Sequence, residues 1–315
     1  MTRSLFRYSP AVRQRGFTLV EMIVVIVITG IIGGIVAIFV TAPVQGYVDS
    51  SRRAAMTDIA DIALRRMSRD IRTALPNSVR VTACGSGGQC LEYLETVAGG
   101  RYKTHACLDG GACTSLTTLG DLVSGANGTV SSTLVNGGVL IPGTTRVAVY
   151  NQYNNTAEDC SAANPSAYCA AGSGGAPAIT AVTNGTNAED VISFASTSFI
   201  PAGGSPYNRF QIISQPVTYA CLPVAGGGTS GTLTRYWGYD IQPAQPRTFA
   251  SGNLVVTGAT VPQHALLAEN VGACNFVYDA SVVAQRAALV ILQMTLTQNG
   301  ESLTLYHSTH VSNVP

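Results

Sequence analysis

Charged side chains are scarce in this sequence. They make up 11% of the 315 residues, and Lys103 is the sole lysine. Four of the 18 basic residues are arginines that precede Gly16, which leaves 14 basic against 17 acidic residues, a net charge of −3, in the remainder. This composition offers no basic footprint for nucleic acid, so we expect no nucleic-acid partner. Gly-x-Ser-x-Gly and His-Glu-x-x-His motifs are also lacking, which predicts that the chain is not an enzyme.

Motifs for a resident metal or cofactor are missing as well. No Cys-x-x-Cys pair occurs, and His307 and His310 would point to opposite faces of a strand, so zinc is disfavoured. Residues 226–231 match Gly-x-Gly-x-x-Gly in their letters. The segment that follows, Thr232–Asp240, has a strand pattern and supplies no helix N-terminus for a pyrophosphate. We therefore expect a glycine-rich hairpin loop there, with no cofactor and no metal centre.

Calcium is kept as an alternative at one place in the chain. Side chains with oxygen ligands gather at Asn184, Asn187, Glu189 and Asp190. Their spacing is not that of an EF-hand loop, which takes its ligands from fixed positions over twelve residues. The sequence therefore favours no metal, while leaving open a calcium ion near residues 184–190.

Cysteine is present in an even number, eight, and all eight follow the apolar N-terminal segment. In an oxidising compartment outside the cytoplasm, disulfides are the default for such a set, and metal ligation is the minor alternative. Sequence alone does not choose the connectivity. The spacing suggests three local loops and one long-range link: Cys84–Cys90, Cys107–Cys113, Cys160–Cys169 and Cys221–Cys274.

A basic leader and an apolar segment open the chain. No acidic residue accompanies the leader arginines, and the nineteen residues from Met22 to Val40 are all apolar, glycine or threonine. As a helix, this segment is long enough to cross a bilayer. The positive-inside rule keeps the leader cytoplasmic and the rest of the chain outside. Glu21, just inside the apolar run, is costly in lipid and calls for a positive partner. A secretory signal peptide has the opposite order, with its cleavage site behind the apolar segment.

The residues Arg15-Gly-Phe-Thr-Leu-Val-Glu21, followed by an apolar helix, resemble the class III signal of type IV pilins and type II secretion pseudopilins. The resemblance implies that prepilin peptidase cuts between Gly16 and Phe17 and methylates the new amino terminus of Phe17. It also implies that Glu21 pairs with the terminal amine of a neighbouring subunit, which would compensate a carboxylate in lipid. The alternative is an uncleaved single-pass anchor with a chance glutamate.

We expect one long helix from Phe17 to Leu75, interrupted and kinked at Pro43 and ended by Pro76. Its second half has an apolar stripe at roughly helical spacing, formed by Val48, Ala55, Ile59, Ile62, Met67, Ile71 and Leu75. The opposite face has i,i+4 pairs at Asp49/Arg53, Asp61/Arg65 and Arg66/Asp70, which favours a solvated salt-bridged face over a DNA-binding stripe.

After residue 77 the pattern changes to short strands between glycine-rich turns. We expect mostly loops over 84–190, strands at Arg209–Ile213 and Val217–Cys221 separated by a turn at Pro216, and a terminal hairpin around Asn299-Gly300. The predicted fold class is α+β, with a long N-terminal helix packed on an antiparallel β-sheet head whose loops are tied by disulfides. The expected segments are a leader (1–16), a transmembrane half-helix (17–42), an amphipathic half-helix (43–76) and an extracytoplasmic head (77–315).

Further segments at both ends resemble the minor pilins of MSHA pilus biogenesis, which are similar to the J-type pseudopilin of type II secretion. They include Arg235-Tyr-Trp-Gly-Tyr, Cys274-Asn-Phe-Val-Tyr and the closing Val311-Ser-Asn-Val-Pro315. The resemblance implies a subunit that initiates or caps a filament and resides in the inner membrane, with its head in the periplasm, before it joins the pilus. The implied partners are membrane lipid, prepilin peptidase, an inner-membrane assembly platform and other pilin subunits. Alternatives are a tip-located adhesin and a plain anchored extracytoplasmic domain.

Overall fold

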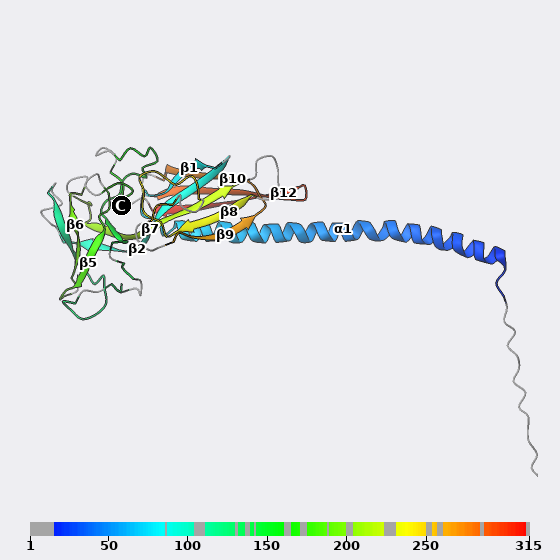
Figure 1. The fold of residues 1–315 in the computed structure, drawn as a ribbon, viewed down its shortest axis with the longest axis horizontal. Coiled ribbons are helices and arrows are strands. Elements are labelled where there is room, and N and C mark those ends of the chain that lie inside the picture. Colours follow the sequence, from blue (N-terminus) through cyan, green and yellow to red (C-terminus); the bar gives the residue numbers. More distant parts are fainter. Residues whose placement is uncertain are drawn as a thin grey trace, which may run out of the picture. The chain divides into compact units, whose positions relative to one another are not determined.

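The structure is a computed structural model. It describes residues 16–85, 87–103, 111–129, 132–135, 139–141, 143–160, 165–170, 175–187, 189–199, 204–223, 231–249, 254–256, 261–283 and 287–312. The chain divides into two compact units, Met1–Ala55 and Met56–Pro315, which are described separately. Its helix, α1 (Leu19–Ile71), begins in the first unit and ends in the second (Figure 1). The described parts of the chain thus combine one long helix with antiparallel strands, which confirms the α+β prediction.

In the first unit, α1 continues through Pro43, so the predicted interruption of the helix at this residue is wrong. An internal proline removes one hydrogen bond and costs about 3 kcal/mol. Helix propagation is cooperative, and hydrogen-bonded turns on both sides of Pro43 keep the segment helical.

The helix ends four residues earlier than predicted because the chain turns to meet the sheet. The backbone N–H of Leu75 donates to the carbonyl of Leu94 at 2.8 Å, and that of Thr96 donates to the carbonyl of Thr73 at 2.9 Å. The carbonyl of Thr73 and the N–H of Leu75 are therefore satisfied by a strand instead of within α1.

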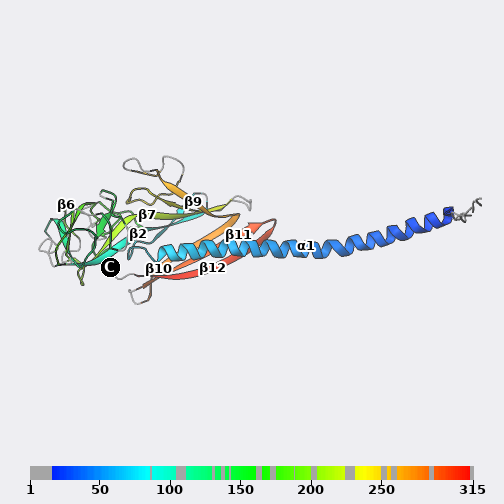
Figure 2. The same ribbon diagram turned by 90° about the horizontal axis from the view of Figure 1, so that it is seen from below.

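The strands of the second unit form two antiparallel sheets in the described residues (Figures 1 and 2). The larger sheet has the order β5-β6-β3-β2-β7-β8-β9, with β1 paired to β2 and β4 paired to β7. The smaller sheet has the order β10-β11-β12. The bounds are β1 Arg80–Cys84, β2 Gly88–Tyr102, β3 Cys113–Leu119, β4 Arg146–Ala148, β5 Ile179–Asn184, β6 Asp190–Thr197, β7 Arg209–Leu222, β8 Thr232–Trp237, β9 Gln263–Glu269, β10 Val271–Val283, β11 Ala287–Gln298 and β12 Glu301–Ser312.

The main core lies between the end of α1 and both sheets. From α1 it contains Met56, Ala60, Ala63, Leu64, Met67 and Ile71, and from the strands residues such as Leu91, Tyr219, Phe276 and Leu292. Small alanines on the helix let the β-strands approach closely, while the long side chains fill the space between the sheets. This core is what fixes the last turns of α1 on the head.

The region 84–190 is mostly loop among its described residues, as predicted, but it contains a second core that the sequence did not predict. Strands β3, β5 and β6 bring together Leu116, Val182, Ile192 and Phe194, each at most 3% exposed, over the far half of β2. Apolar residues in β3 and β5 are separated by two residues, such as threonine, serine or alanine, so these strands lack the strict alternation that marks a strand in sequence. The region is therefore a folded part of the head, in which loops connect these strands.

Strand β7 runs through Pro216, where we predicted a turn. On one side, β7 pairs with β4 up to Ile213 and with β8 only from Thr218 onward. Pro216 falls between these two pairings, and its contact with β2 lies beside a register shift. A proline is tolerated there because its missing N–H removes no hydrogen bond on the side between β4 and β8.

The terminal hairpin is confirmed. Strands β11 and β12 pair without a register shift from Ala287↔Ser312 to Gln298↔Glu301. The two connecting residues, Asn299 and Gly300, have φ angles of 51° and 81°. Both central residues of a type I′ turn need positive φ, which asparagine and glycine tolerate best.

Three disulfides occur among the described residues, and they are three of the four pairs that the spacing suggested. Cys84–Cys90 closes the β1–β2 connection, Cys160–Cys169 ties a loop, and Cys221–Cys274 links β7 of the larger sheet to β10 of the smaller one. Cys107 lies outside the described residues, so the Cys107–Cys113 pair stays a prediction; Cys113 itself is buried.

Candidate processing and assembly site

The Gly16–Phe17 junction lies just before the first helical turn. Gly16 and Phe17 are not helical, α1 begins at Leu19, and the Phe17 side chain is 79% exposed. The leader up to Arg15 lies outside the described residues, so its placement stays a prediction. An exposed segment without backbone pairing is what a peptidase needs in order to bind and cut a chain.

Thr18 caps the N-terminus of α1. Its Oγ1 accepts a hydrogen bond from the backbone N–H of Glu21 at 3.3 Å, and its carbonyl accepts one from the N–H of Met22 at 3.2 Å. Thr18 and Glu21 thus stand at the first and fourth positions of the Ser/Thr-x-x-Glu/Gln capping pattern. A carboxylate in the first turn also interacts favourably with the helix dipole. Glu21 therefore has a role within its own chain as well as the role predicted between subunits; the Thr-x-x-Glu spacing was the sequence signal for it.

The apolar surface of α1 in the first unit is uncovered. Every large apolar side chain from Leu19 to Val40 is exposed, by 48% or more. Among the described residues, α1 is the helix whose length and composition would suffice to cross a membrane. Surface of this size is unstable in water, so lipid or other helices must cover it.

In the second unit, α1 has two isoleucines on its outer face. Ile59 and Ile62 are 44% and 67% exposed, whereas Ala63 and Met67 are buried. The prediction that Ile59 and Ile62 belong to the head-facing stripe is therefore wrong. The core takes the small residues Ala60 and Ala63 instead, because strands can pack closer to them. The helix thus presents apolar side chains away from its own head.

Some acidic residues of α1 pair within the helix, and others bind side chains of the sheet. Asp61 pairs with Arg65 at 2.7 Å on the surface, as the spacing predicted. Asp70, which we expected to pair with Arg66 on the same surface, instead accepts hydrogen bonds from the Tyr219 hydroxyl at 2.6 Å and from Arg235 Nε at 3.1 Å. Burial raises the pKa of Tyr219 above its usual range, and Asp70 contributes in the same direction. This cluster fastens the end of α1 to β7 and β8.

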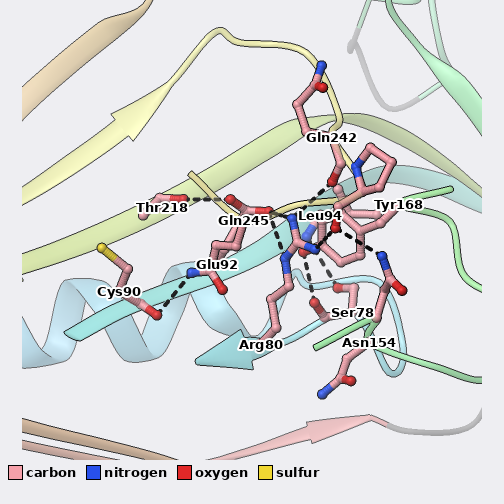
Figure 3. A network of polar contacts seen from close by, with 12 residues as sticks. Ser78, Arg80, Cys90, Glu92, Leu94, Asn154, Tyr168, Thr218, Gln242 and Gln245 are labelled. Atoms are coloured by element: carbon pink, nitrogen blue, oxygen red, sulfur yellow. Dashed lines mark hydrogen bonds and ion pairs between the residues drawn. The ribbon is translucent and has the colours of Figure 1, made fainter. Parts of the chain in front are cut away.

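A buried ion pair organises the neighbouring part of the head. Arg80 on β1 and Glu92 on β2 point toward one another, with Arg80 Nη2 2.7 Å from Glu92 Oε1 (Figure 3). Arg80 also donates to the carbonyls of Gln242 and Pro243, and its guanidinium lies 3.7 Å from the centre of the Tyr168 ring. Desolvation is the largest single effect and lowers the pKa of Arg80, but Glu92, Tyr168 and Tyr239 together raise it more, so the net shift is upward and the side chain stays charged.

The second oxygen of Glu92 is fully used as well. Glu92 Oε2 accepts hydrogen bonds from Thr218 Oγ1 and from the Tyr239 hydroxyl, each at 3.0 Å. Burial, and then the Glu92 carboxylate, raise the pKa of both Tyr168 and Tyr239 well above the usual value. Buried charges need such complete hydrogen bonding. The cluster joins the segment around residue 242 to the sheet, and sequence reasoning missed it because its members are far apart along the chain.

Among the residues considered for calcium, Asp190 accepts hydrogen bonds from backbone N–H groups. Asp190 Oδ2 accepts the N–H groups of Leu122 and Val123, at 2.5 and 2.9 Å, and Asp190 Oδ1 accepts that of Gly185 at 3.2 Å. Glu189 pairs with Lys103 at 2.6 Å. In the part of the chain that the structure describes, no three His, Cys, Asp or Glu side chains are grouped as metal ligands would be. Asp190 thus holds two loops together.

Residues 12–37 match the family model described as the prokaryotic N-terminal methylation motif. This match supports a type IV pilin-like protein, for which the motif implies processing by prepilin peptidase and assembly with pilin subunits. Together with the apolar helix, it indicates anchoring in a membrane. Neither the curated proteins nor the solved structures give a significant match to the chain.

Proposed function

We propose that the chain is a minor pilin of an MSHA-type type IV pilus or a related type II secretion-like system. Prepilin peptidase cuts between Gly16 and Phe17 and methylates Phe17, and the subunit then helps to initiate or cap a filament. The observation that carries this proposal is the Gly16–Phe17 junction inside the methylation motif, placed directly before a capped and uncovered apolar helix.

The apolar half of α1 is suited to two environments in succession, first lipid and then the helices of other subunits. Before assembly the leader stays in the cytoplasm, the helix is in the inner membrane, and the head is in the periplasm, as the arginines before Gly16 favour. Afterwards the helices of neighbouring subunits replace lipid around it. Ile59 and Ile62 extend the available apolar surface beyond the membrane span, because they face away from the chain's own head. Glu21 then pairs with the amine of a neighbouring Phe17.

A minor position, near a filament tip, is favoured by the size of the head. About 240 residues follow residue 76, which corresponds to a radius of gyration near 18 Å for a compact domain. Such bulk would crowd a shaft in which every subunit repeats. Motifs at both ends of the chain resemble the MSHA pilus biogenesis protein MshO, which supports the same assignment. Copy number in sheared filaments tests it, since a shaft subunit would be abundant.

The role is one of assembly and not of catalysis. Three carboxylates, those of Glu92, Asp70 and Asp190, lie at the centre of clusters of polar side chains in the described head. Their oxygens accept hydrogen bonds from groups within the fold. A catalytic acid or base needs an atom free to exchange a proton with a substrate. A second candidate function is a minor pilin that also binds a ligand. It is favoured by the second core, because strands β3, β5 and β6 give the head a folded region beyond the main core.

Replacement of Gly16 by leucine tests the processing step. We expect Gly16→Leu to leave unprocessed precursor in the inner membrane, because a bulky side chain would stand at the cleaved bond. Mass spectrometry of the purified chain should show the full leader in the variant, and N-methylated Phe17 as the first residue in the wild type. Gly33→Leu is the matched control, since no atom lies within 4 Å of a Cβ at Gly33 and the junction is unchanged. Normal processing of Gly16→Leu would contradict the proposal.

A further inference from the structure

Two arginines face each other across the central strands of the head. Arg101 on β2 and Arg209 on β7 are direct partners in an antiparallel pairing that is regular from Ala98↔Ile212 onward. Direct partners project from the same face of a sheet, and like charges in this position destabilise the pair. Arg101 is exposed and Arg209 is half-buried, and no ion pair with an acidic residue is found for either one among the described residues. The sheet thus tolerates a repulsion that nothing in the described fold compensates.

A hollow lies directly beside this pair. The next residue of β2 on the same face is Gly99, opposite Gln211 of β7. Because Gly99 has no side chain, a cavity of about 330 Å³ opens there, lined by Gly99, Gly100, Arg101, Arg209, Phe210 and Gln211. A Cβ atom at Gly99 would come within 3.1 Å of the carbonyl oxygen of Phe210, so the backbone forms the floor of the hollow.

The edge of the hollow offers an aromatic surface. Tyr207 is 61% exposed, and the guanidinium of Arg209 lies 5.2 Å from the centre of its ring. This contact holds Arg209 without neutralising its charge. An exposed tyrosine next to a charged pair can stack on a ring-shaped ligand while the arginines bind its charged group.

Gln211 contributes an acceptor that has no donor. Its Oε1 atom is buried and has no hydrogen-bond partner among the described residues. A buried amide oxygen without a partner costs free energy, unless a ligand supplies the missing hydrogen. Gln211, a residue that lines the hollow, thus carries a neutral acceptor beside the cationic donors.

We propose that this hollow is a binding subsite for the carboxylate of an acidic sugar. The two guanidinium groups match a carboxylate, to which each can donate two hydrogen bonds. The orphan oxygen of Gln211 requires a hydroxyl donor, which a uronic acid carries on its ring. The glycine floor lets the ring lie close to the backbone, and Tyr207 stacks on its edge. Inorganic phosphate has no ring to lie on the glycine floor or to stack on Tyr207, so it would bind more weakly.

The test uses the mature full-length chain in detergent, titrated by calorimetry with trigalacturonic acid, neutral galactotriose and inorganic phosphate. We expect trigalacturonic acid to bind at least tenfold more tightly than either of the other two probes. Arg101→Gln and Arg209→Gln should each weaken its binding at least tenfold, since each removes a charge-assisted pair of hydrogen bonds. Arg247→Gln is the matched control, because Arg247 is an exposed arginine that pairs with Glu158 on another part of the head.

Thermal unfolding of the same variants separates a lost site from a lost fold. Removal of one of two opposed charges should leave the Tm unchanged or raise it, and Gln211→Leu should raise the Tm while weakening trigalacturonic acid binding. Equal affinity of the wild type, Arg101→Gln and Arg209→Gln, or no binding of trigalacturonic acid, would overturn the proposal. Phosphate that binds as tightly as trigalacturonic acid would overturn the assignment of a sugar.

Discussion

At the scale of single residues, Glu21 combines two functions that a plain substitution would confuse. Its backbone N–H donates to Thr18 at the cap of α1, and its carboxylate lies in the first turn. The proposed role between subunits needs the negative charge, whereas the capping pattern accepts glutamate or glutamine at this position. The two roles can therefore be separated by choosing which property is removed.

We expect Glu21→Gln to be cleaved normally and to assemble poorly, because the cap persists while the charge that pairs with a neighbouring amine is lost. Thr18→Ala keeps the charge and removes the cap, at a cost of about 1 kcal/mol in helix stability. It should therefore be incorporated into filaments better than Glu21→Gln. Immunoblots of sheared filaments, normalised to membrane-bound mature chain, measure both. Equal incorporation of Glu21→Gln and wild type would remove the pairing argument.

Single charged residues also show what sequence reasoning could reach. The Asp61–Arg65 pair followed from spacing along one helix. Asp70 satisfied the same rule with Arg66, yet it binds Tyr219 and Arg235, which lie 149 and 165 residues away. Local spacing cannot rank a neighbour on the helix against a partner that the fold brings in from the sheet.

At the scale of elements, the outer face of α1 is the clearest assembly surface in the second unit. Ile62 is 67% exposed there, while Met67, five residues further along, is fully buried in the main core. Both side chains are apolar, but Ile62 is exposed and Met67 is buried in the core. Substitutions at the two positions therefore separate an effect on assembly from an effect on folding.

Ile62→Ser should change the free energy of unfolding of the head by no more than about 0.5 kcal/mol, as is usual for exposed positions. It should nevertheless reduce incorporation into filaments, because it removes apolar area from the proposed contact with a neighbouring helix. Met67→Ala should destabilise the head by about 2–5 kcal/mol through the cavity that it leaves. Denaturant unfolding followed by near-UV circular dichroism measures stability. Full incorporation of Ile62→Ser would show that this face is not used.

Among strands, the sequence predicted those with strong local signals and missed those that depend on distant partners. The β11–β12 hairpin followed from alternation on both sides of Asn299-Gly300. Strand β2, the longest in the described chain, was not foreseen, because its glycines at 99 and 100 resemble a turn. Their positions are explained by β7, whose Phe210 covers Gly100. Pro216 likewise led to the prediction of a turn, although β7 continues through it.

The processing junction is the part of the candidate site that the sequence predicts by itself, since it is a contiguous motif. The hollow at Arg101 and Arg209 could not be supplied, because it needs the register between two strands that are 108 residues apart in sequence at this pair. The same limit applies to Arg80 and Glu92, whose environment comes from four separate segments.

At the scale of the whole head, the second unit is held together by buried tyrosines that lie between sheets and loops. Tyr93 and Tyr219 lie in the main core, and Tyr168 and Tyr239 surround the Arg80–Glu92 pair. Burial is the main cause that raises the pKa of each of the four hydroxyls above its usual value, which is close to 10. Each group therefore prefers to stay protonated in the folded state, and this preference makes stability depend on pH.

The sign follows from linkage. A tyrosine with a raised pKa holds its proton when folded but loses it near pH 10 when unfolded, so its stabilisation is present below pH 10 and is lost as pH rises toward the folded pKa. Each tyrosine contributes a slope of about 1.4 kcal/mol per pH unit in that window. We expect the free energy of unfolding of the head to be flat from pH 8 to 9 and to fall steeply above about pH 10. Tyr239→Phe should reduce the slope by about 1.4 kcal/mol per pH unit, whereas Tyr306→Phe, which changes an exposed ring on β12, should leave it unaltered. Denaturant titrations at closely spaced pH values measure this slope. A slope that is the same in Tyr239→Phe and Tyr306→Phe would mean that the buried hydroxyls do not control the alkaline stability of the head.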